Sequence, residues 1–584
     1  MNRRSRWAAA LAALLVAAGL IAFGRTAPIR HLEKRLARTH AVRRDLHSAR
    51  LTRLLARAGE LVVQPPLATS EISRASTALE TSEKSETSLP AETSATPDDP
   101  ASCPDLELSG RQLPLGELPS SASAPSPWKT AGPPLVSLWL DPCRSARVHA
   151  RPWKPGRETE ETGWISFYEG GALRFATPAG IRIHGGASRK HPPYGYRLSF
   201  RSEHGSSGFP GELLSTALSA PLSRLIVAES DDQDRDGSLW SFPGDVAYDI
   251  GRALGAQVPF TRPVWVSVNG EPARIATIEE HIDSDYMLRH YGHDNFELVR
   301  GKRFENDPRS DNIAANQTWK SELAWIAGAP APFTLRAANQ RYDIDKLTTW
   351  LVTVLFCATG DLYQDAMYRD RTGGEIDGRW SWIHWDHDMS FRTPPLNSRF
   401  ANKHDLLPYV LDGRRAIVAP QQALLLRLVQ EDPAYSAEII RRTTLALNHQ
   451  ITPAFLRALV EHYEKVAMEL GIQDLHWVGR LQEFFDSRPG AVYAQLTKIL
   501  DAGKPVAVEL QAPPGTVRVD GFPLGSRYAG LYPAGQAIDA EVEPAARGRF
   551  IGWSIPGGDA ASVSAPALHI VVARPMAIVA NFRD

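Results

Sequence analysis

Residues 357–393 read CATGDLYQDAMYRDRTGGEIDGRWSWIHWDHDMSFRT, and the main predicted domain is organised around them. It follows an apolar run, Trp350 to Ala358, which predicts a buried helix that ends at Gly360. Two strand-like runs, Ala366–Asp370 and Arg379–Trp385, are separated by Gly-Gly and Asp-Gly turn signals. The stretch therefore predicts a buried helix, a short acidic loop and a pair of strands.

Two aspartates, Asp386 and Asp388, stand just past the second predicted strand. Side chains two residues apart on an extended chain point to the same side, so both carboxylates can reach one cation. Magnesium is a hard ion that takes oxygen ligands, typically one or two carboxylates together with substrate phosphates. The spacing predicts a magnesium site, and ordinary loop acids at a strand end are the alternative interpretation.

Length and composition narrow the class of protein. A chain of 584 residues is long enough for two to four domains and at least one large core. Its 65 basic and 66 acidic residues balance, which argues against a nucleic-acid partner. Three cysteines are too few for a disulfide framework or a cysteine-based zinc site. Cys103 and Cys143 can pair in an oxidising compartment or remain free thiols, and Cys357 is expected in the core.

The first 25 residues are predicted to anchor the protein in a membrane. Three arginines within Met1–Arg6 precede an apolar run from Trp7 to Phe23. This pattern predicts a signal anchor over residues 1–25, a single span with the arginines in the cytoplasm and the bulk of the chain outside. A cleaved signal peptide is the alternative. A charged helix is predicted over residues 26–63.

Three regions follow along the chain. Residues 64–134 are rich in Ser, Thr, Pro and Glu and predict a disordered linker, because they offer too little apolar surface to bury. Residues 135–503 form the main predicted domain, which opens with strands and ends with helices at 421–430, 435–447, 453–470 and 475–500. Residues 504–584 return to short alternating runs and turns, so a small all-β domain is expected there.

Two further strand pairs carry polar residues. Gly180–Phe200 reads as strand, glycine-rich turn and strand, a geometry in which backbone N–H groups can cradle phosphates. An ordinary turn is the alternative. A hairpin across Asn269-Gly270, a strong turn signal, joins residues 263–268 to 274–280 and ends in Glu279-Glu280.

Together these segments resemble the CotH-type kinase family, the atypical protein kinases related to spore-coat protein H. The resemblance covers roughly residues 135 to 500 and is most specific at Gly180–Phe200, Asn269–Glu280 and Asp361–Phe391. It implies an α+β fold, with a bilobal kinase-like domain that has a helical C-terminal lobe. The last residues resemble the small β-domains found at the ends of bacterial surface proteins.

The resemblance also implies an activity, in which the γ-phosphoryl group of ATP passes to a Ser or Thr hydroxyl of a surface or envelope protein. ATP and Mg2+ are the cofactors that it implies. Asp361 would orient or deprotonate the acceptor. The remaining implied roles are phosphate positioning by Arg182, Arg189, Arg197, Glu280 and Lys302, with Glu280 and Lys302 as an ion pair, and metal binding by Gln364, Asp386 and Asp388.

The chain departs from the family pattern at three places. His191–Gly195 stand where the family has lysines, Gln364 stands where it has a metal-facing Asn, and Arg392 stands where it has glycine. Asp365 could substitute for Gln364 as a ligand. Two alternatives therefore stay open: a catalytically degenerate kinase-like adhesin or scaffold, and a kinase fold with another nucleotide-transfer chemistry.

Overall fold

The computed structural model divides the chain into two compact units, Met1–Val63 and Gln64–Asp584. The residues it describes are 103, 132–154, 156–185, 187–190, 192–206, 208–228, 242–300, 310–360, 362, 365–372, 378–391, 405–412, 419–556 and 563–583. All of them belong to the second unit, so the predicted anchor, the charged helix and most of the linker lie outside the described residues. None of the described helices is long and apolar enough to cross a membrane.

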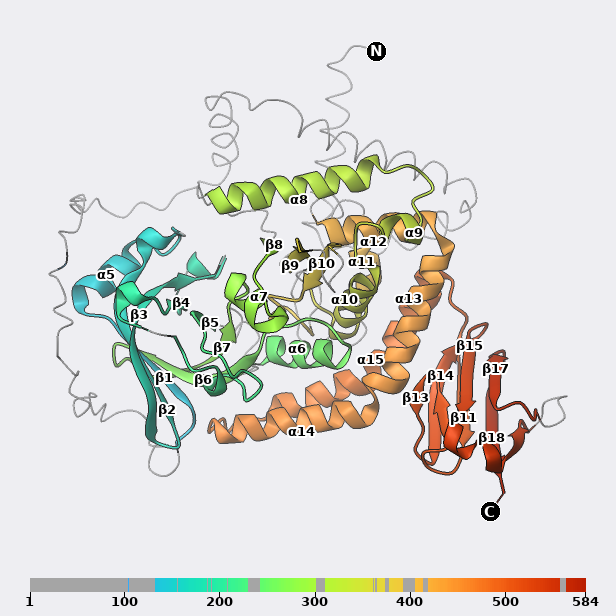
Figure 1. Ribbon diagram of the computed structural model, residues 1–584. Coiled ribbons are helices and arrows are strands. Elements are labelled where there is room, and N and C mark those ends of the chain that lie inside the picture. Colours follow the sequence, from blue (N-terminus) through green and yellow to red (C-terminus); the bar gives the residue numbers. More distant parts are fainter. Residues whose placement is uncertain are drawn as a thin grey trace, which may run out of the picture. The chain divides into compact units, whose positions relative to one another are not determined.

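The first described strands close into a barrel in the order β1-β2-β3-β4-β5-β7-β6 (Figure 1). Neighbouring strands are antiparallel, except that β1 and β6 pair in parallel. Alternation places Ile181 and Ile183 in the barrel core, while Arg182 between them points to the outer face. The strands are β1 (Leu135–Trp139), β2 (Glu161–Glu169), β3 (Ala172–His184), β4 (Gly195–Ser199), β5 (Arg224–Ala228), β6 (Thr261–Val268) and β7 (Arg274–Glu280).

Helix α5 (Pro142–Ala150) packs on β2 and β3 of the barrel. It begins at Asp141, whose side chain accepts a hydrogen bond from Arg144 N. Cys103 and Cys143 form a disulfide at this helix, which decides between the two alternatives left open for these thiols. Cys357 is a buried free cysteine, as expected.

A small sheet, in the order β10-β9-β8, lies beside a buried helix. Its strands are β8 (Phe296–Arg300), β9 (Ala366–Asp370) and β10 (Ser381–Ile383). Helix α10 (Ile344–Cys357) packs against β10, and all but two of its residues, Asp345 and Lys346, are buried. The helix ends because Ala358 adopts the left-handed conformation. The helix and the two strands predicted in the opening stretch are therefore present, although the helix ends at Cys357 and not at Gly360.

Helices make up most of the remaining chain up to residue 500, and the α+β class is confirmed. The four helices predicted between residues 421 and 500 are present as α12, α13, α14 and α15. The helices are α6 (Pro243–Ala253), α7 (Ser284–Tyr291), α8 (Ser310–Gly328), α9 (Leu335–Ala338), α11 (Leu406–Val410), α12 (Pro420–Glu431), α13 (Pro433–Leu445), α14 (Pro453–Glu469) and α15 (His476–Leu500).

The C-terminal residues form two sheets around one core (Figure 1, red). The described strand orders are β14-β11-β18-β16 and β13-β12-β15-β17, and Trp553 is fully buried between the sheets. The strands are β11 (Pro505–Gln511), β12 (Val517–Val519), β13 (Phe522–Pro523), β14 (Arg527–Pro533), β15 (Ala537–Val542), β16 (Phe550–Ser554), β17 (Ala567–Val571) and β18 (Met576–Phe582).

Candidate active site

The loop that carries Asp386 and Asp388 is a tight bend rather than an extended strand end. Strand β10 stops at Ile383, and Asp386 has a φ of 63° in the left-handed region. A turn follows, closed by a hydrogen bond of 3.2 Å from Ser390 N to His387 O. The extended spacing expected for the two aspartates is therefore wrong. An aspartate tolerates the left-handed conformation better than most residues, which explains its place in the bend.

Three hydrogen-bond acceptors from separate parts of the chain fix this bend. Asp386 N donates to the hydroxyl of Tyr248 on α6 over 2.9 Å. Trp385 N donates to Asp365 Oδ1 over 3.1 Å, and the Trp385 indole donates to Glu279 Oε1 over 2.8 Å. Because α6, β7 and the residue before β9 all hold the bend, the backbone at Asp386 is set by tertiary structure.

Asp365 has a structural role in this arrangement. Its side chain is buried, and its Oδ2 accepts a 2.7 Å hydrogen bond from the indole of Trp350. Its Oδ1 lies 3.2 Å from His387 Nε2 in addition to its bond from Trp385 N. Both carboxylate oxygens are thus used inside the protein, which argues against Asp365 as a replacement metal ligand.

Carboxyl groups concentrate around the bend. Burial, together with the charges of Asp386 and Asp245, raises the pKa of Glu279 to about 8. Burial likewise raises the pKa of Asp245 to about 7, and the pKa of the Tyr248 hydroxyl is raised by burial and by the charges of Glu279, Asp386 and Asp388. A hard cation among carboxylate oxygens would relieve this repulsion, so the donor set at the bend fits magnesium.

A row of outward-facing side chains crosses the barrel next to the bend. Four residues on neighbouring strands pair in sequence across the sheet. In order they are Arg182 on β3, Arg197 on β4, Ile226 on β5 and Glu279 on β7. Neighbouring strands are about 4.8 Å apart, so Arg197 and Glu279 are separated by about 10 Å along this row. Since Glu279 also contacts Trp385, the arginine row and the acidic bend meet at Glu279.

Two of the predicted phosphate-contacting arginines already face oxygen acceptors of the protein. Arg182 is buried, with its Nε 3.8 Å from Glu160 Oε2. Arg189 donates from Nε to Gly185 O over 2.6 Å and from Nη1 to Pro152 O over 3.3 Å. Arg189 therefore fastens the glycine-rich turn to the loop after α5, whatever else it contacts.

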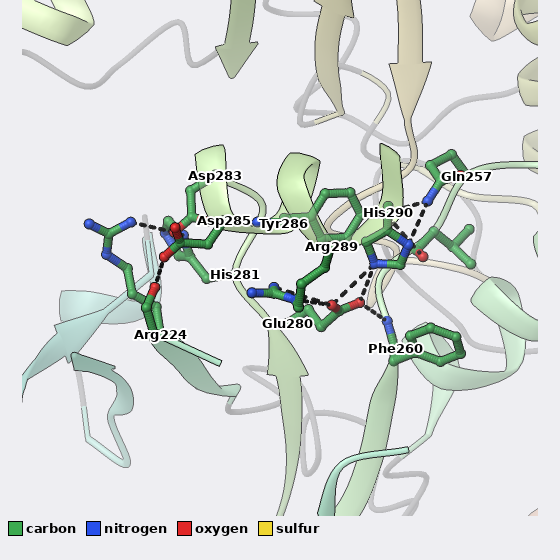
Figure 2. A network of polar contacts seen from close by, with 12 residues as sticks. Arg224, Gln257, Phe260, Glu280, His281, Asp283, Asp285, Tyr286, Arg289 and His290 are labelled. Atoms are coloured by element: carbon green, nitrogen blue, oxygen red, sulfur yellow. Dashed lines mark hydrogen bonds and ion pairs between the residues drawn. The ribbon is translucent and has the colours of Figure 1, made fainter. Parts of the chain in front are cut away.

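Glu280 points away from the bend, because consecutive strand residues face opposite sides. Its fully buried carboxylate accepts hydrogen bonds from Phe260 N at 3.0 Å and from Arg289 Nε at 3.3 Å, and lies 3.1 Å from His290 Nε2 (Figure 2). The basic partners of Glu280 in the described part of the chain thus come from α7. Lys302, its predicted partner, lies outside the described residues.

The structure brings Asp386, Asp388, Arg182 and Arg197 to one region of the molecule. Asp361 and Gln364 lie outside the described residues, as do Gly186, His191 and Arg392. Glu279 was not predicted from the sequence as a member of the site. The alternation of β7 contained that signal, since only one of the two adjacent glutamates can face the bend.

Two other polar regions do not belong to this site. Among the described residues, one group of side chains could converge on a metal ion: Glu160, Glu203 and His204. Arg201 forms ion pairs with both glutamates and thus already supplies the positive charge there. A cleft of about 680 Å³ lies between β6 and α14, and no predicted site residue lines it.

The barrel presents arginines beside a bend that carries two aspartates. Kinase-like proteins have this charge distribution, because they hold phosphates with positive charges and a metal ion with negative charges. Known families support this class. The family model for CotH kinase protein matches residues 181–474, half of the chain, and the chain belongs to this family. No curated protein is a significant match.

Proposed function

We propose that the protein transfers the γ-phosphoryl group of ATP to a Ser or Thr hydroxyl of a surface or envelope protein. One observation carries the proposal: tertiary hydrogen bonds fix the bend at Asp386. One of these bonds joins Trp385, the residue before Asp386, to Glu279, and Glu279 lies at the end of the row that contains Arg182 and Arg197. Phosphoryl transfer is catalysed mainly by positioning and by charge stabilisation, and carboxylates and arginines held by tertiary contacts would supply both.

Asp386 and Asp388 would hold the metal ion, and Arg197 would contact the nucleotide phosphates. Magnesium, when bound, would neutralise phosphate charge during transfer. Tyr248 and Glu279 hold the bend through Asp386 N and the Trp385 indole, so they set where the carboxylate of Asp386 lies. Asp361 is proposed to accept the proton of the acceptor hydroxyl, a role taken from the family resemblance.

The disulfide supports an extracytoplasmic location. Disulfides persist in oxidising compartments and are rare in the cytosol, and Cys103 and Cys143 are paired in the structure. We propose that the predicted N-terminal span anchors the chain with residues 26–584 outside. The thiol state in intact cells tests this topology: Cys143 should resist a thiol-alkylating reagent until the cells are treated with reductant. Alkylation without reductant would contradict the proposed compartment.

The activity is tested with the full-length chain in detergent, incubated with γ-labelled ATP, magnesium and an envelope fraction as acceptor. We expect label on Ser or Thr, identified by mass spectrometry as a phosphoryl group. Asp361→Asn should lower the transfer rate about a hundredfold while ATP still binds. Asp345→Asn, whose side chain is 85% exposed, is the matched control.

Two outcomes would replace the proposal. A nucleotidyl group on the acceptor would establish the other nucleotide-transfer chemistry. A wild-type protein that binds neither ATP nor magnesium would favour the adhesin or scaffold.

A further inference from the structure

We infer that His281 is a positioning residue that aims the guanidinium of Arg197 at the nucleotide phosphates, an inference that rests on the proposed function. His281 follows β7 and is 2% exposed. Its Nε2 lies 2.9 Å from Arg197 Nη1, and its Nδ1 lies 3.0 Å from Asp283 Oδ2. The imidazole therefore bridges an arginine of β4 and a carboxylate at the start of α7.

The partners of the ring determine its tautomer. An arginine has donors and no acceptor, so a hydrogen bond between Arg197 and His281 requires an unprotonated Nε2. The proton of the neutral ring is then on Nδ1, where it is donated to Asp283. His281 in this form accepts from the arginine on one side and donates to the aspartate on the other.

Asp283 holds the Nδ1 side of the His281 ring in place. Its Oδ1 accepts from Tyr286 N over 3.1 Å and caps α7. Its Oδ2 also forms an ion pair with Arg224 (Figure 2). Burial alone would raise the pKa of Asp283, but hydrogen bonds from His281 and Arg224 and the charge of Arg224 hold that pKa well below its usual range. Asp283 is therefore ionised and immobile at neutral pH.

Arg197 differs from its neighbour Arg182 in the charge of its partner. Arg182 faces the carboxylate of Glu160, whereas the partner of Arg197 in the described part of the chain is an imidazole. The Nε of Arg197 is buried and has no hydrogen-bond partner among the described residues. His281 thus orients the guanidinium without cancelling its positive charge, which stays available to attract an anion. A carboxylate at position 281 would orient Arg197 equally well but would neutralise it.

Two substitutions at position 281 separate orientation from structure. His281→Asn retains a donor for Asp283 near the position of Nδ1 but cannot reach Arg197. His281→Gln can place an amide oxygen near the position of Nε2, where it accepts from Arg197. We expect His281→Asn to raise the KM for ATP about tenfold, the effect of one charge-assisted hydrogen bond, with kcat much less affected. His281→Gln should recover most of this loss.

Arg197→Ala and a histidine control complete the experiment. Arg197→Ala should raise the KM for ATP at least as much, and adding His281→Asn to it should have little further effect, because the two residues act as a unit. His149→Asn is the matched control, since His149 contacts Tyr196 of the same strand at 3.0 Å but not Arg197. It should leave the KM unchanged.

The outcomes distinguish the two hypotheses. An unchanged KM in Arg197→Ala means that Arg197 does not contact phosphate and overturns that part of the proposed function. If Arg197→Ala raises the KM while His281→Asn does not, the positioning role is wrong and the proposed function stands. Equal losses in His281→Asn and His281→Gln would also contradict it. Absence of ATP binding by the wild type overturns both.

Discussion

At the scale of single residues, Glu279 is buried and accepts a hydrogen bond from the bend that carries Asp386. Its pKa rises from 4.5 to about 8 in the fold, mainly through burial. The folded state then binds a proton that the unfolded state releases between these two values. The resulting contribution to stability is fully present below pH 4.5 and is lost as the pH rises toward 8.

We predict that Glu279→Gln flattens this pH dependence. Glutamine resembles the protonated carboxyl and keeps an oxygen that can accept from Trp385. Between about pH 5.5 and 7.5 the wild type should lose roughly 1 kcal/mol more per pH unit than the variant, measured by urea unfolding without magnesium. Glu271→Gln, at an exposed turn, should behave as the wild type. Parallel pH profiles for wild type and Glu279→Gln would show that Glu279 is ionised at neutral pH.

Single residues were predictable where a local pattern carries the chemistry. Asp386 and Asp388 were proposed as metal ligands from their spacing, which stays a prediction, whereas the bend at Asp386 was not predicted. Glu279 and His281 were not found, because their roles depend on which strands become neighbours in the barrel. Burial and pairing across the barrel are tertiary properties that a short sequence window does not contain.

At the scale of elements, Asp365 joins α10 to the bend after β10. Replacing it with Ala removes acceptors for the Trp350 indole and for Trp385 N, both in a buried environment. Unsatisfied buried donors are costly, so Asp365→Ala should lower the free energy of unfolding by about 3 kcal/mol, measured by denaturant titration. Asp345→Ala, an exposed residue of α10, should change it by less than about 0.5 kcal/mol. A loss for Asp365→Ala as small as this control would mean that Asp365 does not hold the bend.

Element positions followed from the sequence more reliably than their pairing. The predicted hairpin of residues 263–268 and 274–280 is present as β6 and β7, since an Asn-Gly turn and alternating residues determine it locally. The parallel pairing of β1 with β6, which closes the barrel, joins segments that are far apart in the chain. No local signal specifies that contact.

At the scale of the whole molecule, the C-terminal β-domain contacts the helices directly. Tyr493 on α15 donates to Leu531 O on β14 over 2.7 Å, and the Asn448 amide makes hydrogen bonds of 3.0 and 3.1 Å with the backbone of the same residue. The ring of His449 stacks on both Phe522 and Tyr528. Because of these contacts, we expect the C-terminal β-domain to stabilise the helices and not to move independently of them.

We predict that the helices and the C-terminal domain unfold together. Calorimetry of the full-length chain should show one transition for both parts, and Asn448→Ala should lower its free energy of unfolding by about 1–2 kcal/mol through the two lost hydrogen bonds. Lys465→Ala, on the exposed surface of α14, is the control. Two separate transitions, with Asn448→Ala affecting neither, would indicate an independent domain.

For the whole molecule, the proposed function depends on Asp386 binding a metal ion that is used with ATP. Asp386→Asn tests it most directly, because asparagine tolerates the left-handed backbone at this position and keeps the N–H that donates to Tyr248. The substitution therefore removes one charge with little change in the fold. In titration calorimetry, magnesium should strengthen ATP binding by the wild type and should not strengthen ATP binding by Asp386→Asn. The thermal stability of the two proteins without magnesium should be the same. Equal magnesium-dependent ATP binding by the two folded proteins would contradict the assignment of Asp386 as the metal ligand.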